Sequence, residues 1–426
     1  MMRMTCAVVG IALATLPLPA QIIAITGGRV YPVSGPMIEN GTVLIRDGRI
    51  VAVGTNVSIP NDAQRVDASG KWVTPGLVNS ATNLGLVEVG QVAQTREERA
   101  QGRDRIAAAF TVWDGLNPAS VNIRANRNGG VTSAVVLPGG GLIAGQAAIL
   151  SLVDGSAADM IDRSPVAMVA QIGDPASAGA GSRGELLVKL REVLEDARVY
   201  SRRKAEFERA DTRPFAASRL DLEALIPVVE GRLPLLVNAD KASDIESALK
   251  LAADLRLRLI LGGAAEAWLV ADKIAAAKVP VLTGAMNNIP TSFAALGQRQ
   301  ENPGLLRRAG VQVAIVGNAG GGDEEAFNIR NVKQEAGNAV AYGMSWDDAL
   351  RAVTLTPAEM FGVADRYGSL QPGKVANVVV WSGDPFELST QVEHVFLRGR
   401  EITDSPSRQD LLERRYRSLP PRYGSP

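Results

Sequence analysis

Eight short apolar segments rich in β-branched residues, separated by stretches with helical spacing, constrain the fold of this chain most strongly. Strands that alternate with helices form βα units, and such units build a parallel sheet. Eight units over roughly 290 residues fit a closed (β/α)8 barrel of the TIM type, and spacing alone leaves an open doubly wound sheet as the alternative. The segments expected to be strands are Trp72–Val78, Val131–Leu137, Ala147–Val153, Val166–Gln171, Pro234–Asn238, Leu257–Leu261, Val279–Thr283 and Val311–Val316.

Two β-rich flanks enclose this α/β middle. Residues 25–73 alternate apolar and polar side chains, and the Asp47-Gly48 pair between two β-rich arms predicts a two-residue hairpin turn. Residues 375–403 show the same pattern. The chain is therefore expected to be of the α/β class, with β structure at both ends.

The most charged stretch, residues 183–213, carries leucine, valine and alanine at helical spacing. We interpret it as an amphipathic helix with a solvated face; a nucleic-acid or partner-binding arm is the alternative. The whole chain has 45 basic and 45 acidic residues and only 4% aromatic residues. Neither value favours a surface for nucleic acid.

The first twenty residues resemble a secretory signal peptide, with Arg3 before the apolar run Cys6–Leu16 and cleavage expected near Ala20. A buried strand is the alternative for this segment. Cleavage would remove Cys6, the single cysteine, and no later stretch is apolar enough to span a membrane. We therefore expect a periplasmic or secreted protein without disulfides or membrane attachment.

The counts of histidine and cysteine exclude several kinds of active site. The chain has one histidine, His394, and one cysteine. Zinc sites built from several such ligands are excluded, as are cysteine nucleophiles in the mature chain and Ser-His-Asp triads that do not use His394. We expect His394 to be an exposed residue of a C-terminal strand rather than a catalytic group.

A series of motifs, in order along nearly the whole mature chain, resembles the amidohydrolase superfamily, specifically its secreted, imidazolonepropionase-like branch. The resemblance implies a metal-centred barrel and a small composite β-sandwich built from both chain ends. The motifs that carry it are Trp72–Asn79, Gly130–Ser133, Leu137–Gly140, Ala349–Thr354, Pro357–Glu359, Gly368–Lys374 and Trp381–Pro385.

Together with the terminal sequence patterns, this resemblance predicts a division of the chain into five segments. We expect a signal peptide over residues 1–20 and the N-terminal part of the sandwich over 21–73. The barrel would cover 74–365, and the C-terminal part of the sandwich 366–403. Residues 404–426 would form a tail.

The positions that resemble the family's metal ligands carry other residues here. The strand-one His-x-His pair aligns with Ala81 and Asn83, and the strand-five histidine aligns with Asn238. The strand-six histidine aligns with Gly262, and the strand-eight aspartate, which activates water, aligns with Asn318. Alanine and glycine have no donor atom, and a carboxamide oxygen is a weak, neutral ligand. We expect no catalytic residue, no metal and no cofactor at these positions.

Three further residues are candidates for the same pocket. Gln171 ends strand four, where a bridging lysine or glutamate could have served. Glu88 follows strand one, at the pocket or at its rim, and Asp323 follows strand eight. The acidic run at Asp323 could hold Ca²⁺ or Mg²⁺, although we interpret it as the solvated first turn of a helix.

The function expected from these residues is that of an amidohydrolase homologue that has lost its metal site. It would act as a non-catalytic subunit beside an active homologue, as a self-oligomer, or as a protein that binds a small amide-like ligand. The alternative is an active hydrolase of C–N bonds in small amides or peptides that uses a non-standard site, and a purely structural role is a third.

Overall fold

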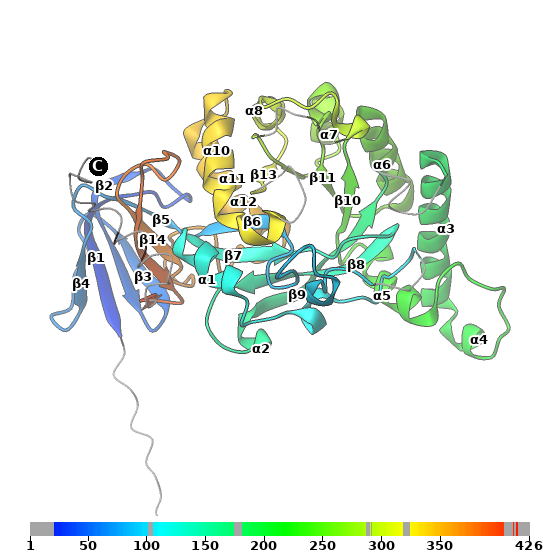
Figure 1. Cartoon of the computed structure of the whole chain (residues 1–426), viewed down its shortest axis with the longest axis horizontal. Helices are drawn as coiled ribbons and strands as arrows, with labels where there is room; N and C mark the ends of the chain where they lie inside the picture. The colour runs from blue at the N-terminus through cyan, green and yellow to red at the C-terminus, as the bar shows by residue number, and fades with distance from the viewer. Residues whose placement is uncertain are drawn as a thin grey trace, which may run out of the picture.

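The structure is a computed structural model that describes residues 21–100, 105–173, 181–286, 290, 292–317, 324–403, 412 and 415. The segment expected to be a signal peptide, Asn318, Asp323 and nearly all of the expected tail lie outside the described residues. No helix of the described part is long and apolar enough to cross a membrane. Figure 1 shows a β domain at one end of the molecule and a larger α/β barrel beside it.

The β domain is composite, as expected. Its eight-stranded sheet has the order β16-β15-β14-β5-β1-β2-β3, and β4 pairs with β1 beside this path. Hydrogen bonds thus join all strands into one branched sheet. The strands are β1 (Ile22–Val30), β2 (Ile38–Arg46), β3 (Arg49–Gly54), β4 (Gln64–Asp67), β5 (Trp72–Pro75), β14 (Val378–Trp381), β15 (Val392–Leu397) and β16 (Arg400–Glu401).

The hairpin predicted at Asp47-Gly48 is present between β2 and β3. Both turn residues have positive φ angles, 51° at Asp47 and 76° at Gly48, as a type I′ turn requires. The close approach of Arg398 explains why glycine is needed at the second position, because a Cβ on Gly48 would lie 2.7 Å from the Arg398 carbonyl oxygen. This turn therefore packs directly against the C-terminal part of the domain.

The barrel is a nearly closed sheet of eight strands in the order β13-β12-β11-β10-β9-β8-β7-β6. The two end strands, β6 and β13, lie in contact. The closed-barrel expectation is thus confirmed over the doubly wound alternative. The strands are β6 (Leu77–Thr82), β7 (Val131–Val136), β8 (Ile143–Ser151), β9 (Ile161–Gln171), β10 (Leu235–Ala239), β11 (Leu259–Gly263), β12 (Val281–Thr283) and β13 (Val313–Ile315).

Two expected strands need correction. The segment Trp72–Val78 divides at Gly76 into β5 of the β domain and β6 of the barrel. Position 76 has no room for a side chain, because a Cβ there would lie 2.1 Å from a side-chain atom of Thr132. The third strand, β8, runs antiparallel to both β7 and β9, so it is not part of a βα unit. The remaining neighbours in the barrel sheet pair in parallel.

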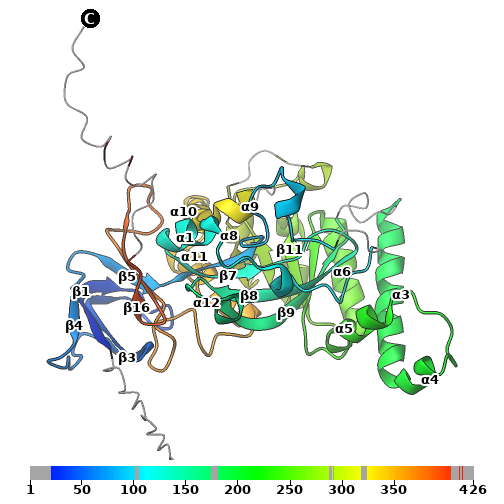
Figure 2. The same cartoon turned by 60° about the horizontal axis from the view of Figure 1, so that its bottom comes forward.

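Helices cover the outside of the barrel, with α3, α5 and α6 on one side and α1, α10 and α11 toward the β domain (Figures 1 and 2). The charged stretch forms α3, whose buried face includes Leu186, Leu190 and Val193, as the spacing predicted. The α-helices are α1 (Val121–Asn128), α2 (Ala157–Met160), α3 (Arg183–Arg202), α4 (Lys204–Glu208), α5 (Arg219–Val229), α6 (Ala242–Leu255), α7 (Ala271–Ala276), α8 (Asn302–Arg308), α9 (Glu324–Phe327), α10 (Val332–Ala341), α11 (Trp346–Ala352) and α12 (Leu355–Met360). Short 3-10 helices are η1 (Ala93–Thr95), η2 (Val112–Gly115), η3 (Ala267–Val270), η4 (Phe293–Ala295) and η5 (Ile329–Asn331).

The barrel lumen is a separate apolar core. Alternate residues of the strands point inward, among them the buried Leu236, Ile260 and Leu282. Residues that follow α12, including Phe361, pack against the same cluster and close one end of the lumen. Because this end is filled, the space for a ligand lies at the other end, where the parallel strands finish.

A buried aspartate joins the barrel to the β domain. Asp162 lies at the amino end of β9, and its side chain is 1% exposed. Its Oδ1 accepts hydrogen bonds from Tyr367 Oη (2.6 Å), Arg366 Nη2 (3.2 Å) and Arg398 Nη2 (3.1 Å). Arg398 belongs to the turn between β15 and β16, so this contact links the two domains.

Candidate functional site

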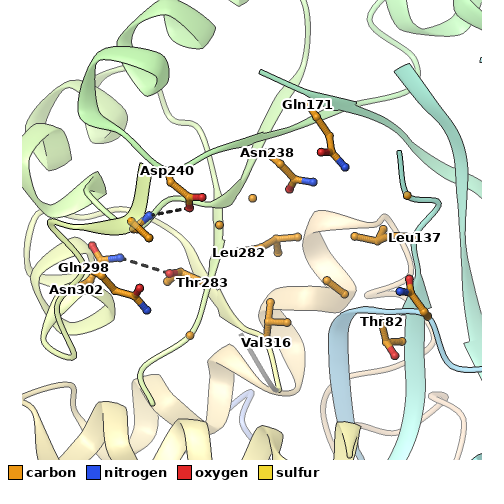
Figure 3. Close-up of a pocket in the computed structure, with 18 of the residues that line it drawn as sticks. Thr82, Leu137, Gln171, Asn238, Asp240, Leu282, Thr283, Gln298, Asn302 and Val316 are labelled. Atoms are coloured by element: carbon orange, nitrogen blue, oxygen red, sulfur yellow. Dashed lines mark hydrogen bonds between the residues drawn. The ribbon is translucent and has the colours of Figure 1, made fainter. Parts of the chain in front are cut away.

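A cavity of about 330 Å³ opens at the carboxyl ends of the barrel strands, the end that carries the active site in barrel enzymes. Four of the five positions expected at this mouth line it together with Gln171 (Figure 3). They are Ala81, Asn83, Asn238 and Gly262. The fifth position, Asn318, lies outside the described residues.

Two other candidates lie elsewhere. Glu88 is not among the cavity-lining residues of the described part; its Oε1 accepts a hydrogen bond from Asn117 Nδ2 (2.9 Å), so it belongs to the rim loop. His394 lies in β15 of the β domain, where its Nδ1 is 2.6 Å from Glu401 Oε1. The expected place in a C-terminal strand is observed, but His394 is less exposed than predicted, with 30% of its side chain exposed, and it lines neither cavity at the barrel mouth.

The polar layer of the cavity follows from strand alternation. In β10, Leu236 faces the lumen and Asn238 points the same way two residues later, at the carboxyl end. Gln171 is the register partner of Asn238 on β9, and both carboxamides point into the same space in Figure 3. The lumen is thus apolar at depth and lined by carboxamides at the mouth.

Asn238 occupies the space that a side chain at position 262 would need. Asn238 and Gly262 are register partners on neighbouring parallel strands. A Cβ built on Gly262 would lie 2.1 Å from Asn238 Oδ1 and 3.1 Å from a methyl carbon of Leu236. The glycine and the asparagine therefore fit each other as a pair.

Asp240 is a site residue that the sequence reasoning missed. It follows β10 and is the one carboxylate among the described lining residues. Its Oδ1 accepts a hydrogen bond from the Ala265 backbone N–H (3.3 Å), the dashed line beside it in Figure 3. Burial raises the pKa of the Asp240 carboxyl, the Ala265 N–H opposes this, and the nearby charges of Asp244 and Glu266 raise it further.

Gly263 leaves room for this carboxylate. It is the register partner of Ala239, and a Cβ on Gly263 would lie 2.5 Å from Asp240 Oδ1. Its φ of +71° also belongs to the left-handed region that side chains disfavour. The signal for Asp240 in the sequence was a lone acid directly after a strand that ends in a lining residue.

The far wall comes from the segments after β12. Asn302, at the start of α8, is 2% exposed and donates its Nδ2 to the Ala264 carbonyl (3.0 Å) and to Thr283 Oγ1 (3.4 Å). Its Oδ1 has no hydrogen-bond partner in the structure. Buried Glu335 of α10 holds the adjoining loop, because its Oε2 accepts the backbone N–H groups of Ala285 (2.5 Å) and Met286 (2.7 Å).

A second cavity of about 380 Å³ adjoins the first and shares Gln171, Asn238 and Asp240 with it. Its outer wall includes Arg183 and Phe293. The Phe293 side chain is 85% exposed. The two cavities together make the mouth a groove with a carboxylate between them.

Comparison with known proteins indicates the family to which this barrel is related. The sequence profile of the Amidohydrolase family matches residues 261–402. Imidazolonepropionase of Pseudomonas putida is 26% identical over 86% of this chain and 95% of its own length. Amidohydrolase tasK of Hapsidospora irregularis is 25% identical over 86% of this chain, which spans 40% of the length of tasK.

The solved structures give the same result. The crystal structure of an amidohydrolase from Thermotoga maritima MSB8 superimposes with a TM-score of 0.81 at 26% identity, covering 90% of this chain and all of the other. The barrel and its β domain therefore have the fold of this amidohydrolase structure. The chain belongs to the amidohydrolase superfamily, with imidazolonepropionase-like relatives.

Proposed function

We propose that this protein is an amidohydrolase-superfamily member without the family's metal centre, and that it binds a small amide-like ligand at the barrel mouth. One observation carries the proposal. Ala81, Asn83, Asn238 and Gly262 converge on one cavity, and none of them has an imidazole or a carboxylate.

These residues do not fit a catalytic transition metal. Catalytic zinc takes three strong protein ligands and keeps one position open for water. Within the described parts of the chain, no three His, Cys, Asp or Glu side chains come together as a metal-binding group. The contact between Asn238 and Gly262 adds a steric obstacle, because a side chain at 262 would overlap the Asn238 amide. The described residues at the mouth therefore supply no ligand set that could activate water through a metal.

The cavity is suited to an amide instead. Carboxamides both donate and accept hydrogen bonds, and Asn83, Gln171 and Asn238 present them on one side. Asn302 Oδ1 offers a buried acceptor without a partner in the structure, and a ligand N–H would relieve the cost of leaving it unpaired. Apolar Leu282 and Val316 line the floor. An uncharged group with one N–H and one C=O matches these walls.

Asp240 supports the alternative, a hydrolase of C–N bonds that works without the family's metal. A carboxyl with a raised pKa next to a cavity can act as a general base. In that case Asp240→Asn would abolish hydrolysis of a small amide or dipeptide. The ligand-binding proposal predicts no hydrolysis by the wild-type protein.

The test pairs elemental analysis with binding and activity measurements. Dialysed protein is expected to contain zinc, iron and manganese far below one atom per chain. A panel of small amides is expected to raise the melting temperature, and an amidase and dipeptidase panel to show no turnover. Stoichiometric metal, or metal-independent turnover lost in Asp240→Asn, would favour the hydrolase.

Two expectations about cellular context belong to the same proposal. Export to the periplasm is supported by the composition of residues 1–20, and N-terminal sequencing of the protein recovered from cells would test it. Association with an active homologue or with a second copy would explain why a barrel without the metal centre is maintained. Light scattering of the purified protein would test self-association. Co-purification with a tagged homologue would test association with an active homologue.

A further inference from the structure

We propose that the barrel mouth takes the cationic end of its ligand, an ammonium or guanidinium group, between Asp240 and Phe293. This deepens the proposed function and rests on it: the carboxamide cavity would hold the amide part of the ligand, and the adjoining cavity the positive charge. The two cavities share Asp240, so one small molecule can occupy both.

Among the described residues, Asp240 has no positively charged partner. No lysine or arginine of the described chain forms a salt bridge with it, and within the described residues its carboxylate accepts a hydrogen bond from the Ala265 backbone N–H alone. Asp244 and Glu266 are close enough to make the electrostatic potential at Asp240 more negative. A half-buried carboxylate in this position is costly without a counter-charge. A cation that enters the cavity would supply one.

The nearby arginines are already engaged by other groups. Arg183 Nε lies 2.7 Å from Asp244 Oδ2. Arg299 stacks on Trp268, with 4.7 Å between the guanidinium carbon and the ring centroid, and its Nη2 lies 3.3 Å from Glu301 Oε1. Asp240 is therefore not neutralised from either side of the mouth.

The second wall of the charge site is aromatic. Phe293 lines the same cavity as Asp240, and its ring is 85% exposed. The face of such a ring attracts organic cations, and the attraction grows when the cation is partly desolvated. A carboxylate and an aromatic ring on one cavity favour an ammonium or guanidinium group over a neutral or anionic one.

Glycines on the neighbouring strand leave space for the Asp240 carboxylate. Gly263 would collide with Asp240 Oδ1 if it carried a Cβ, at a distance of 2.5 Å. Together with Gly262 it forms a glycine pair at the end of β11 that gives space to Asn238 and Asp240 in turn. The pair positions one neutral and one charged acceptor next to each other, as a ligand with an amide and a cation requires.

Calorimetric titration with matched probes tests the inference. The probes are N-acetylagmatine, which carries an amide and a guanidinium, and its isostere with a urea in place of the guanidinium. The wild-type protein is expected to bind the guanidinium compound about tenfold more tightly or better. Asp240→Asn is expected to remove this preference, and Phe293→Ala to weaken guanidinium binding by about threefold to tenfold. Phe293→Trp should retain it.

The controls separate this inference from the function on which it rests. Asp254→Asn removes an exposed acid of α6 that lines neither cavity, and it should leave both affinities unchanged. Equal binding of the two probes, unchanged in Asp240→Asn, would overturn the cation site but keep the amide-binding function. Failure of both probes and of every neutral amide in the panel would overturn both.

Discussion

Two aspartates at opposite ends of the barrel show how position changes the role of one residue type. Asp162 begins β9 at the closed end and accepts hydrogen bonds from Tyr367, Arg366 and Arg398. Asp240 follows β10 at the open end and has one described bond, from a backbone N–H. Burial raises the pKa of both carboxyls. The Oδ1 atom of Asp162 is held by three donors of its own chain, whereas Asp240 is left for a ligand.

This difference agrees with the division of labour in barrels, where the amino ends of the strands support stability and the carboxyl ends support function. Changes at Asp162 should therefore damage the fold, whereas changes at Asp240 should affect binding and leave the fold intact. The predictions below test that contrast.

The largest effect is expected from Asp162→Ala. It leaves two guanidinium groups and the Tyr367 hydroxyl without their common acceptor. We expect a loss of about 2–3 kcal/mol in the free energy of unfolding, below the usual range for a broken buried pair because both arginines are more than a third exposed. Urea unfolding would measure it. Asp254→Ala on the surface is the control, and an equal loss there would contradict the assignment.

Gly262→Ala should give the next largest effect. The added Cβ meets the Asn238 amide, so we expect a destabilisation of about 1–3 kcal/mol. The double change Gly262→Ala with Asn238→Ala removes the collision and should recover part of the loss, with a coupling of about 1 kcal/mol. Unfolding of the four proteins in this cycle measures the coupling. Strict additivity would mean that the two positions are not adapted to each other.

Asp240→Asn should stabilise the folded protein at neutral pH, whereas Asp162→Ala should destabilise it. The folded-state pKa of Asp240 is raised, so the free energy of unfolding of the wild-type protein falls as pH rises above the ordinary aspartate range. The variant should match the wild type near pH 4 and exceed it at pH 7, by less than about 1 kcal/mol because water reaches the carboxylate. Melting curves at both pH values test this. A variant that is less stable at pH 7 would give Asp240 a structural role.

The smallest expected effect is none. The double change Ala81→His with Asn83→His rebuilds the strand-one pair but leaves Asn238 and Gly262 as they are, so the positions that align with the family's ligands hold at most two strong ligands. Zinc catalysis needs a third ligand and groups that orient each imidazole. We expect no metal-dependent hydrolysis of amides or dipeptides. Adding Asn238→His, Gly262→His and Asn318→Asp should give weak zinc binding or poor folding, because position 262 has no room for a side chain.

Most of the barrel could be predicted from the sequence because its strands are short β-branched runs at regular spacing. The direction of β8 could not be predicted from such a run, because a β-branched run has the same pattern in a parallel and in an antiparallel strand. A signal was nevertheless present. The connection between Val136 and Ile143 is too short for the crossover that parallel strands need.

The candidate site was predicted in part. The lining positions Ala81, Asn83, Asn238 and Gly262 followed from motif order, and the cavity brings them together. Asp240 was not predicted because it lies two residues beyond Asn238, outside the positions that the resemblance aligns with metal ligands. The contribution of Phe293 depends on how a loop lies over the mouth, which no local pattern encodes.

The pairing of β5 with β14 has a consequence for how the chain reaches its native state. Trp72 is the register partner of Trp381, and Trp381 Nε1 donates to Thr74 Oγ1 across 307 positions of sequence. Ribosomes release the N-terminal half of this sheet long before its neighbour exists. Contacts so distant in sequence slow folding, because closing a long loop has an entropic cost. Until the last strands arrive, β5 presents an unpaired edge that is open to association with other chains. The β domain is thus the first to begin synthesis and the last to have all its strands.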